Sequence, residues 1–232
     1  MKCVRCARIN TEHARQCVCG FPFVVEEGDE RGLQAWFDEV RHILQSAYVA
    51  APTPWQQSGK RGSFEEWVRL RIPVSQCVTR SGTFLDIGCA NGFLLESLVS
   101  WTKMKELDLV PYGLDFAPKL LEMARERLPS FHNHFFLGNA WDWHPPRRFR
   151  YVLTEADCVP HNLRAVYLRR LLQEFLEEDG VLLVTHYRSS GDDLTRDWLD
   201  EDLRAEGFHV IGSVSGFNGA GQEKCRVAML HP

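Results

Sequence analysis

The sequence has no apolar run that approaches the roughly 18 residues needed for a membrane-spanning helix, so we expect no membrane segment. It also has no internal repeat and no low-complexity tract, and its opening, MKCVRCARIN, lacks the apolar stretch of a secretory signal. Basic residues are not in excess, since 27 lysines and arginines face 31 acidic residues and the formal net charge is −4. We therefore expect a cytoplasmic protein with no global charge that favours nucleic acid.

The chain is long enough for one domain of average to large size plus a small appendage, with 232 residues of which 44% are hydrophobic. Four of its eight cysteines lie near the start, in the pairs Cys3 and Cys6, then Cys17 and Cys19. Two close thiolate pairs joined by a short loop suit a tetrahedral Zn²⁺ ion. So short a segment cannot bury a sufficient core alone, so metal binding would supply its folding free energy. A metal site in a reducing compartment fits this spacing better than a disulfide framework.

This N-terminal segment resembles a short zinc ribbon, in which ARQCVCGFPF would form the second knuckle. It departs from the usual pattern because the second cysteine pair encloses one residue in place of two. The sequence leaves three interpretations open, namely structural zinc, which we favour, a redox-active tail, and a ribbon without metal. His13 lies between the pairs and could replace a thiolate ligand.

A glycine-bounded turn follows the strand-like run at residues 83–87 and leads directly into an apolar helical pattern. Free backbone N–H groups and the positive end of a helix dipole at such a turn suit a carboxylate or phosphate. Gly88 and Gly92 permit backbone angles and a close ligand approach that a Cβ would block. The next strand-like run, residues 109–114, ends in Asp115, where a carboxylate can accept hydrogen bonds from ribose hydroxyls. The two runs together indicate a nucleoside site, although such turns also join strands and helices without a ligand.

The segments LDIGCANGFLLESL and YGLDFAPKLLEMARERLP resemble the first two motifs of the class I S-adenosylmethionine-dependent methyltransferases, and the resemblance spans residues 80–230. It implies an α/β Rossmann-like methyltransferase fold with a mostly parallel seven-stranded sheet whose last strand is antiparallel, here with a small N-terminal zinc ribbon added. The sequence departs at Ala90, where a glycine is usual, and we expect so small a side chain to be tolerated. The dinucleotide fingerprint G-x-G-x-x-G is absent, which argues against a nicotinamide cofactor.

The resemblance implies an S-adenosyl-L-methionine site built from several loops. Its expected residues are Asp86, Gly88, Cys89, Ala90, Asn91, Gly92 and Phe93 of the first motif, Asp115 and Phe116 of the second, Asn139, Ala140 and Trp141 after the third strand, Glu155 after the fourth, and Trp55, Gln57 and Ser58 from a covering loop. Asn139 would meet the adenine amine through its side-chain carbonyl, with Asp142 as the alternative. The covering loop, residues 51–62, could instead be a plain surface linker.

The methyl acceptor is expected near the ends of the later strands, because ligands of open α/β sheets bind outside the carboxyl ends of the strands. His161, His186 and Tyr187 are our catalytic candidates, since histidine titrates near neutrality, although a single histidine at a strand end can also be structural. Arg69 and Arg71 could reach an acidic group, but we expect them to be solvated helix charges.

Helical spacing predicts helices over residues 33–48, 162–177 and 192–206, and a further helix from residue 63 that kinks or ends at Pro73. We divide the chain into a zinc-ribbon-like segment at 1–25, a region with linker, N-terminal helices and covering loop at 26–80, and a methyltransferase domain at 81–232. The predicted activity is methyl transfer to an oxygen or nitrogen atom of a small molecule.

Two other functions stay open. One is an rRNA or tRNA methyltransferase in which the ribbon and the arginines at 164, 169 and 170 dock on phosphates. The other is a non-catalytic module that only senses the cofactor. The sequence gives no indication of the oligomeric state.

Overall fold

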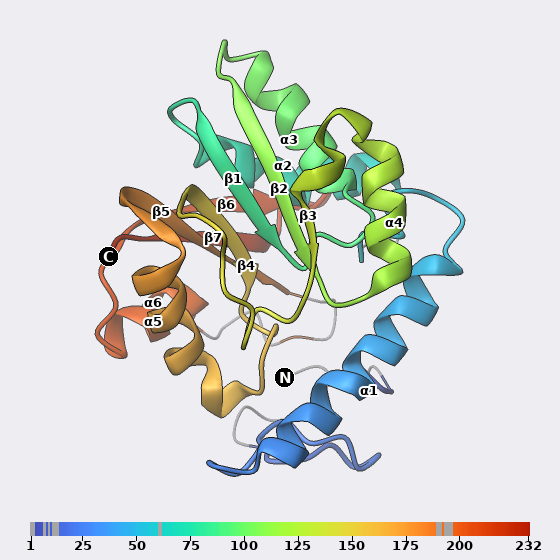
Figure 1. Ribbon diagram of the computed structural model, residues 1–232. Helices are drawn as coiled ribbons and strands as arrows, with labels where there is room; N and C mark the ends of the chain where they lie inside the picture. The colour runs from blue at the N-terminus through green and yellow to red at the C-terminus, as the bar shows by residue number, and fades with distance from the viewer. Residues whose placement is uncertain are drawn as a thin grey trace.

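The computed structural model describes residues 3–6, 8, 10, 14–59, 62–188, 192 and 197–232. Within them one seven-stranded sheet has the order β3-β2-β1-β4-β5-β7-β6 (Figure 1). The strands are β1 Gly82–Ile87, β2 Leu109–Asp115, β3 Phe135–Leu137, β4 Phe149–Glu155, β5 Leu176–Tyr187, β6 Val210–Phe217 and β7 Glu223–Leu230. Strands β1 to β5 pair in parallel, whereas β7 runs antiparallel to both β5 and β6. The predicted fold class is confirmed.

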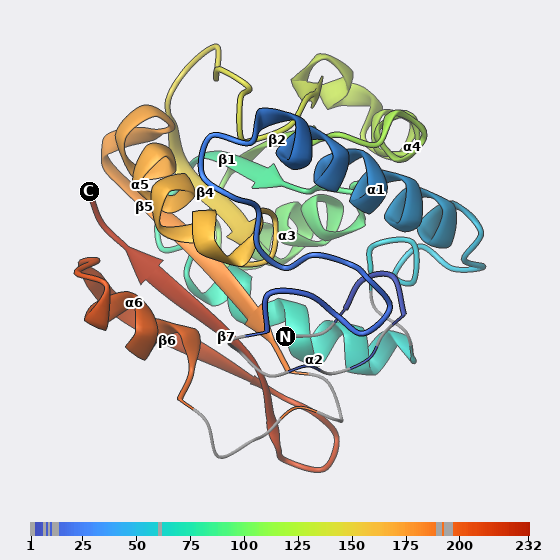
Figure 2. The same cartoon turned by 90° about the horizontal axis from the view of Figure 1, so that it is seen from below.

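Helices cover both faces of the sheet (Figures 1 and 2). They are α1 Glu30–Val49, α2 Phe64–Gln76, α3 Phe93–Lys103, α4 Pro118–Arg127, α5 Arg164–Glu174 and α6 Leu199–Ala205, with the short 3₁₀ helices η1 Pro129–His134 and η2 His161–Leu163. The period of two along a strand sends neighbouring side chains to opposite faces. Phe84 accordingly packs in the apolar core under α2, α3 and α4, and Leu85 packs in the core under α5 and α6. None of the described helices combines the length and the apolarity that crossing a membrane requires.

The centre of the sheet holds the point where strand order reverses, because β1 pairs with β2 on one side and with β4 on the other. At this switch point two crossovers leave in opposite directions and open a crevice at the carboxyl ends of the strands. Asp86 near the end of β1 is in register with Leu153 near the end of β4. In Figure 1 these strand ends point toward α1 and the N-terminal segment.

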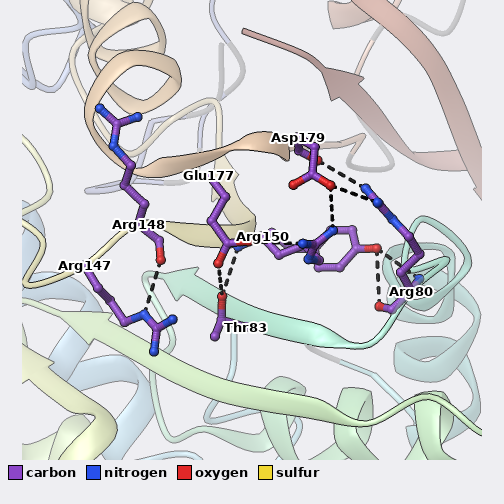
Figure 3. A network of polar contacts seen from close by, with 8 residues as sticks. Arg80, Thr83, Arg147, Arg148, Arg150, Glu177 and Asp179 are labelled. Carbon is purple, nitrogen blue, oxygen red and sulfur yellow. Dashed lines mark hydrogen bonds and ion pairs between the residues drawn. The ribbon is translucent and has the colours of Figure 1, made fainter.

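A charged network joins neighbouring strands near their amino ends, opposite to the ends that form the crevice (Figure 3). Arg150 and Arg80 donate to Asp179 at 3.0 and 2.9 Å between nitrogen and oxygen. The backbone N–H of Arg150 donates to the Thr83 hydroxyl at 3.0 Å, which joins β4 to β1. Exposed ion pairs contribute about 0–1 kcal/mol each, so this network aligns strand ends more than it stabilises the fold.

Three predicted element boundaries are corrected. The helix expected at 162–177 ends at Glu174, and β5 already begins at Leu176, because the Gly180 region packs against the backbone of β4 where its register shifts. Of the two expected effects of Pro73, a kink or an end of the helix, the end is wrong, because α2 continues past Pro73 to Gln76. In the region 192–206 the observed helix, α6, begins at residue 199, and residues 193–196 lie outside the described residues.

Candidate functional site

Asp115 clamps the glycine-containing loop onto the end of β2. One oxygen of its carboxylate, Oδ2, accepts the backbone N–H of Ala90 at 2.8 Å, and the other, Oδ1, accepts that of Ala117 at 2.8 Å. The loop is also held from the backbone, where Gly88 N–H donates to Leu114 O at 2.8 Å. Burial raises the pKa of Asp115 to about 6, although hydrogen bonds from the backbone N–H groups of Ala117, Ala90 and Phe116 lower it. Each carboxylate oxygen keeps a second lone pair that can accept a hydrogen bond from a ligand.

The loop needs left-handed backbone at three positions. Gly88 has φ +81° and Gly92 has φ +72°, and a Cβ on Gly92 would come within 3.1 Å of both the Cα and Cβ of Ala124. Ala90, which replaces the usual glycine, has φ 47° and carries its methyl group in the left-handed region. Such a conformation costs an alanine about 1 kcal/mol, which the hydrogen bond to Asp115 can offset.

A cleft with about 390 Å³ of empty space, partly open to solvent, lies over the ends of β1, β4 and β5. Its lining comes from both the cofactor and the acceptor regions predicted from the sequence and comprises Ser58, Arg71, Asp86, Ile87, Gly88, Cys89, Ala90, Leu94, Leu153, Thr154, Glu155, Thr185 and Tyr187.

Asp86 is the most perturbed carboxyl group of the cleft. It is 4% exposed, and burial raises its pKa to about 8, with the charges of Glu155 and Asp115 adding to the rise and Arg71 opposing it. Glu155 lies at the exposed mouth, where desolvation by the surrounding protein also raises its pKa and Arg71 lowers it. The cleft therefore holds a proton on Asp86 near neutral pH.

This proton makes the stability of the ligand-free protein depend on pH. Between the ordinary aspartate pKa of about 4 and the folded value of about 8, the native state binds a proton that the unfolded chain has released. Stability must then fall as pH rises through this window, by up to about 1.4 kcal/mol per pH unit. We expect urea midpoints measured from pH 5 to pH 8 to decline in the wild type and to decline less in Asp86→Asn. The exposed Asp108→Asn is the matched control, and an unchanged slope in Asp86→Asn would contradict the assignment.

The covering loop is attached to the glycine loop by Asn91. The fully buried Asn91 amide donates to Pro54 O at 3.0 Å and to Gln57 Oε1 at 3.2 Å. The indole N–H of Trp55 donates a hydrogen bond to Gly62 O. Of the three predicted loop residues, only Ser58 lines the cleft. Asn91 and Gln57 thus hold the loop in place, an arrangement unlike that of a plain linker.

The remaining predicted cofactor residues surround the ends of β2 and β3. Asn139 Oδ1 accepts the backbone N–H of Trp141 at 3.1 Å, so one lone pair of its side-chain carbonyl is already used. Ala140 is buried and Trp141 is partly exposed. Phe116 packs beside Ala90 in a small apolar cluster, and Phe93 at the start of α3 lies 4.8 Å from the ring centroid of Trp67. The structure places Phe116, Asn139, Ala140 and Trp141 after the ends of the paired strands β2 and β3, close in sequence to Asp115 or to its partner strand.

The three catalytic candidates are placed differently. Tyr187 and Thr185 line the cleft, whereas His186 between them faces the opposite side of β5 and packs on Trp198 at 5.4 Å between ring centroids. His161 begins η2, and its backbone N–H donates to Phe23 O at 3.0 Å. Neither histidine is among the residues lining the cleft, and burial lowers the pKa of both. Burial raises the pKa of Tyr187, so its hydroxyl stays protonated at neutral pH.

Arg71 lines the cleft, so our expectation from the sequence that it would be solvated was wrong. It is 6% exposed, and its guanidinium carbon lies 3.8 Å from the centroid of the Tyr187 ring. A signal was present, because Arg71 follows Trp67 by four positions and precedes Val74 by three. That spacing puts it on the buried face of α2. Thr154 and Thr185, which also line the cleft, carried no comparable signal.

The four N-terminal cysteines converge. Their sulfur atoms all lie within 4.8 Å of one another, with Cys3 and Cys19 3.5 Å apart and Cys6 and Cys17 3.6 Å apart. Four thiolates at the corners of a tetrahedron around Zn²⁺ are about 3.8 Å apart for zinc–sulfur bonds of about 2.3 Å. The donor set therefore fits a metal ion. His13 lies outside the described residues.

The segment after the cysteines is docked on the rest of the molecule. Phe21, Phe23 and Val25 belong to the apolar core that also contains residues of α1 and α5. The Asn162 side chain bridges both backbone groups of Val25, accepting its N–H at 3.2 Å and donating to its carbonyl at 2.8 Å. This segment consequently packs on residues 156–163, which continue directly from the cleft residue Glu155.

The arginines of α5 do not form the predicted surface stripe. Arg164 is buried and forms an ion pair with Glu206. Arg170 donates to the backbone carbonyls of residues 140, 141 and 143, at 2.7 to 2.9 Å, and Arg169 donates to the carbonyl of Glu206. Because these guanidinium groups bind within the chain, they offer little to an external phosphate.

No family model matches the sequence, and no curated protein matches it. Solved structures do match. The 1,6-didemethyltoxoflavin-N1-methyltransferase of Burkholderia thailandensis has a TM-score of 0.60 at 15% identity over 85% of this chain and 89% of that chain. An S-adenosylmethionine-dependent methyltransferase from Aquifex aeolicus has a TM-score of 0.52 at 15% identity, over 77% and 98%. Phosphoethanolamine N-methyltransferase 1 of Haemonchus contortus has a TM-score of 0.58 at 13% identity, over 85% and 50%. The chain therefore has the fold of S-adenosylmethionine-dependent methyltransferases.

Proposed function

We propose that this chain is an S-adenosylmethionine-dependent methyltransferase that acts on an oxygen or nitrogen atom of a small-molecule acceptor. The observation that carries the proposal is the pair of hydrogen bonds by which Asp115 holds the glycine-containing loop, beside the cleft over the ends of β1, β4 and β5. Two of the neighbours with this fold, from Burkholderia thailandensis and Haemonchus contortus, were solved with S-adenosylhomocysteine bound.

The cofactor, when bound, supplies a methyl group on an activated sulfonium. The residues of the chain would hold and align the reactants. Asp115 would accept the ribose hydroxyls through its free lone pairs, and the loop between Gly88 and Gly92 would receive the amino-acid end. The loop that Asn91 and Gln57 hold in place would limit access of water. Glu155, the exposed carboxylate of the cleft, is placed to take the proton that the acceptor releases.

The cysteine cluster would hold a structural Zn²⁺ ion, because four thiolates and no open ligand position are typical of structural sites. We retain the division at residues 25 and 80 as a proposal about function. The ribbon carries the metal, the middle region covers the cofactor, and the remainder holds the sheet and the cleft.

Neither alternative function gains support from a specific contact. The RNA-binding interpretation relied on the ribbon and on the arginines of α5, and both are engaged within the chain. If RNA were nevertheless the substrate, filter binding to bulk RNA would fall steeply between 50 and 200 mM salt. A non-catalytic sensing module would need the same cofactor site as the enzyme.

Calorimetric titration with S-adenosylmethionine and S-adenosylhomocysteine, followed by transfer of a tritiated methyl group to fractionated cell extract, tests the proposal. We expect both nucleosides to bind one site and the label to enter a small-molecule fraction. Absence of binding would contradict the whole proposal. Label in RNA would favour the RNA methyltransferase, and binding without transfer to any fraction would favour the sensing module.

A further inference from the structure

Arg71 is a buried cation that has no hydrogen-bonding partner within the described part of the chain. Its side chain comes from α2, is 6% exposed, and has a buried Nη1 without an acceptor. A buried charge without a paired anion is costly and rare in folded proteins. Such a group calls for an explanation, and a ligand that completes it is one.

The orientation of the guanidinium favours a ligand in the cleft. Arg71 lines the cleft, and so do Gly88 and Ala90 of the glycine-containing loop and Ser58 of the covering loop. Its planar group stacks on the ring of Tyr187, 3.8 Å from the centroid. Stacking occupies the face of a guanidinium and leaves the N–H groups at its edge available for a planar anion.

The acidic residues of the cleft do not neutralise this cation by direct contact. Asp86 and Glu155 line the same cleft, yet neither forms an ion pair with Arg71 in the described structure. Their influence is through space, since Arg71 lowers the pKa of both carboxyl groups. The cleft thus offers a cation for a carboxylate and carboxyl oxygens that can accept hydrogen bonds from an ammonium group.

We propose that Arg71 binds a carboxylate group of the ligand that occupies this cleft, through paired hydrogen bonds from the edge of its guanidinium. The inference rests on the proposed function and specifies the ligand chemistry of the same site. Two ligands can supply the carboxylate. One is the methionine end of the cofactor, with its ammonium group toward the carboxyl oxygens of Asp86, and the other is an acidic acceptor.

Calorimetry with S-adenosylhomocysteine and its decarboxylated analogue, which differ only in the carboxylate, separates these sources. The variants are Arg71→Met and Arg71→Lys, and the matched control is Arg69→Met, an exposed position on the same helix. If the cofactor supplies the carboxylate, Arg71→Met lowers the affinity for S-adenosylhomocysteine at least about tenfold and leaves the affinity for the decarboxylated analogue unchanged. If the acceptor supplies it, both nucleosides bind all variants equally. Benzoate then binds the wild-type complex and loses at least about tenfold in affinity in Arg71→Met.

Two results would overturn the inference. One is that Arg71→Met changes neither the nucleoside affinities nor benzoate binding. The other is a large fall in melting temperature in Arg71→Met with unchanged affinities, which would identify a structural arginine, because replacing an unpaired buried charge by an apolar side chain should not destabilise the protein. Arg71→Lys keeps the charge if Arg71→Met fails to fold. If S-adenosylhomocysteine does not bind the wild type, the proposed function is wrong, and benzoate titration of the ligand-free protein still tests Arg71.

Discussion

Replacing Asp115 with alanine is expected to weaken S-adenosylmethionine binding by about 100-fold or more. The proposal gives this carboxylate two hydrogen bonds to the ribose, and bonds to a charged group contribute about 1.5–3 kcal/mol each. The same change removes the acceptor of the Ala90 and Ala117 N–H groups, so the glycine-containing loop also loses its clamp. Calorimetric titration of the variant measures the effect directly.

Two further variants separate ligand loss from damage to the fold. Asp115→Asn keeps the size of the side chain but has only one acceptor oxygen, so it should bind more weakly than the wild type and more tightly than Asp115→Ala. Asp108→Ala removes an exposed carboxylate just before β2, at the edge of the sheet away from the cleft, and should bind normally. If Asp115→Ala kept wild-type affinity, the proposed position of the nucleoside would be wrong.

The parts of the site that could be predicted depend on local sequence patterns. The strand-like run, the turn from Gly88 to Gly92 and Asp115 are each read within a few neighbouring residues, and the structure brings them together as expected. The strands alternate and the turns need particular backbone angles, so their positions follow from short-range physics. The antiparallel last strand came only from the family resemblance.

The parts that could not be predicted depend on long-range packing or on which face of an element is buried. The bridge between Val25 and Asn162 joins residues 137 positions apart, and no local pattern indicates it. His186 was assigned by its place at a strand end, but the alternation along β5 puts Tyr187 in the cleft and His186 outside. We expected Arg71 in solvent because arginine side chains are usually exposed. Its position on the buried face of α2 decides the outcome instead, and the side chain is buried.

The contacts of the N-terminal segment predict that removing the metal will loosen residues outside the cysteine cluster. Phe21, Phe23 and Val25 follow the second cysteine pair directly and fill part of the main core. Without the metal this short segment has little of its own to hold it, because structural Zn²⁺ supplies an apparent binding free energy of about 10–16 kcal/mol in zinc-finger peptides. Its release should also free residues 156–163, because His161 N–H and the Asn162 side-chain amide donate hydrogen bonds to the carbonyls of Phe23 and Val25 in this segment.

Cys17→Ser, or chelation of the wild type, should therefore lower the melting temperature and remove one equivalent of zinc per chain. Hydrogen exchange should rise in peptides covering residues 21–25 and 156–163. It should change little in β1 and β2, because each of these strands is hydrogen-bonded to a neighbouring strand on both sides. Cys77→Ser is the control, since Cys77 is a free thiol outside both the metal cluster and the two monitored peptides. A Cys17→Ser protein with full zinc content, or one whose residues 156–163 stay protected after metal loss, would show that the ribbon does not hold the loop beside the cleft. In that case Asn162 and the core contacts of Phe23 would suffice to fix this loop without the metal.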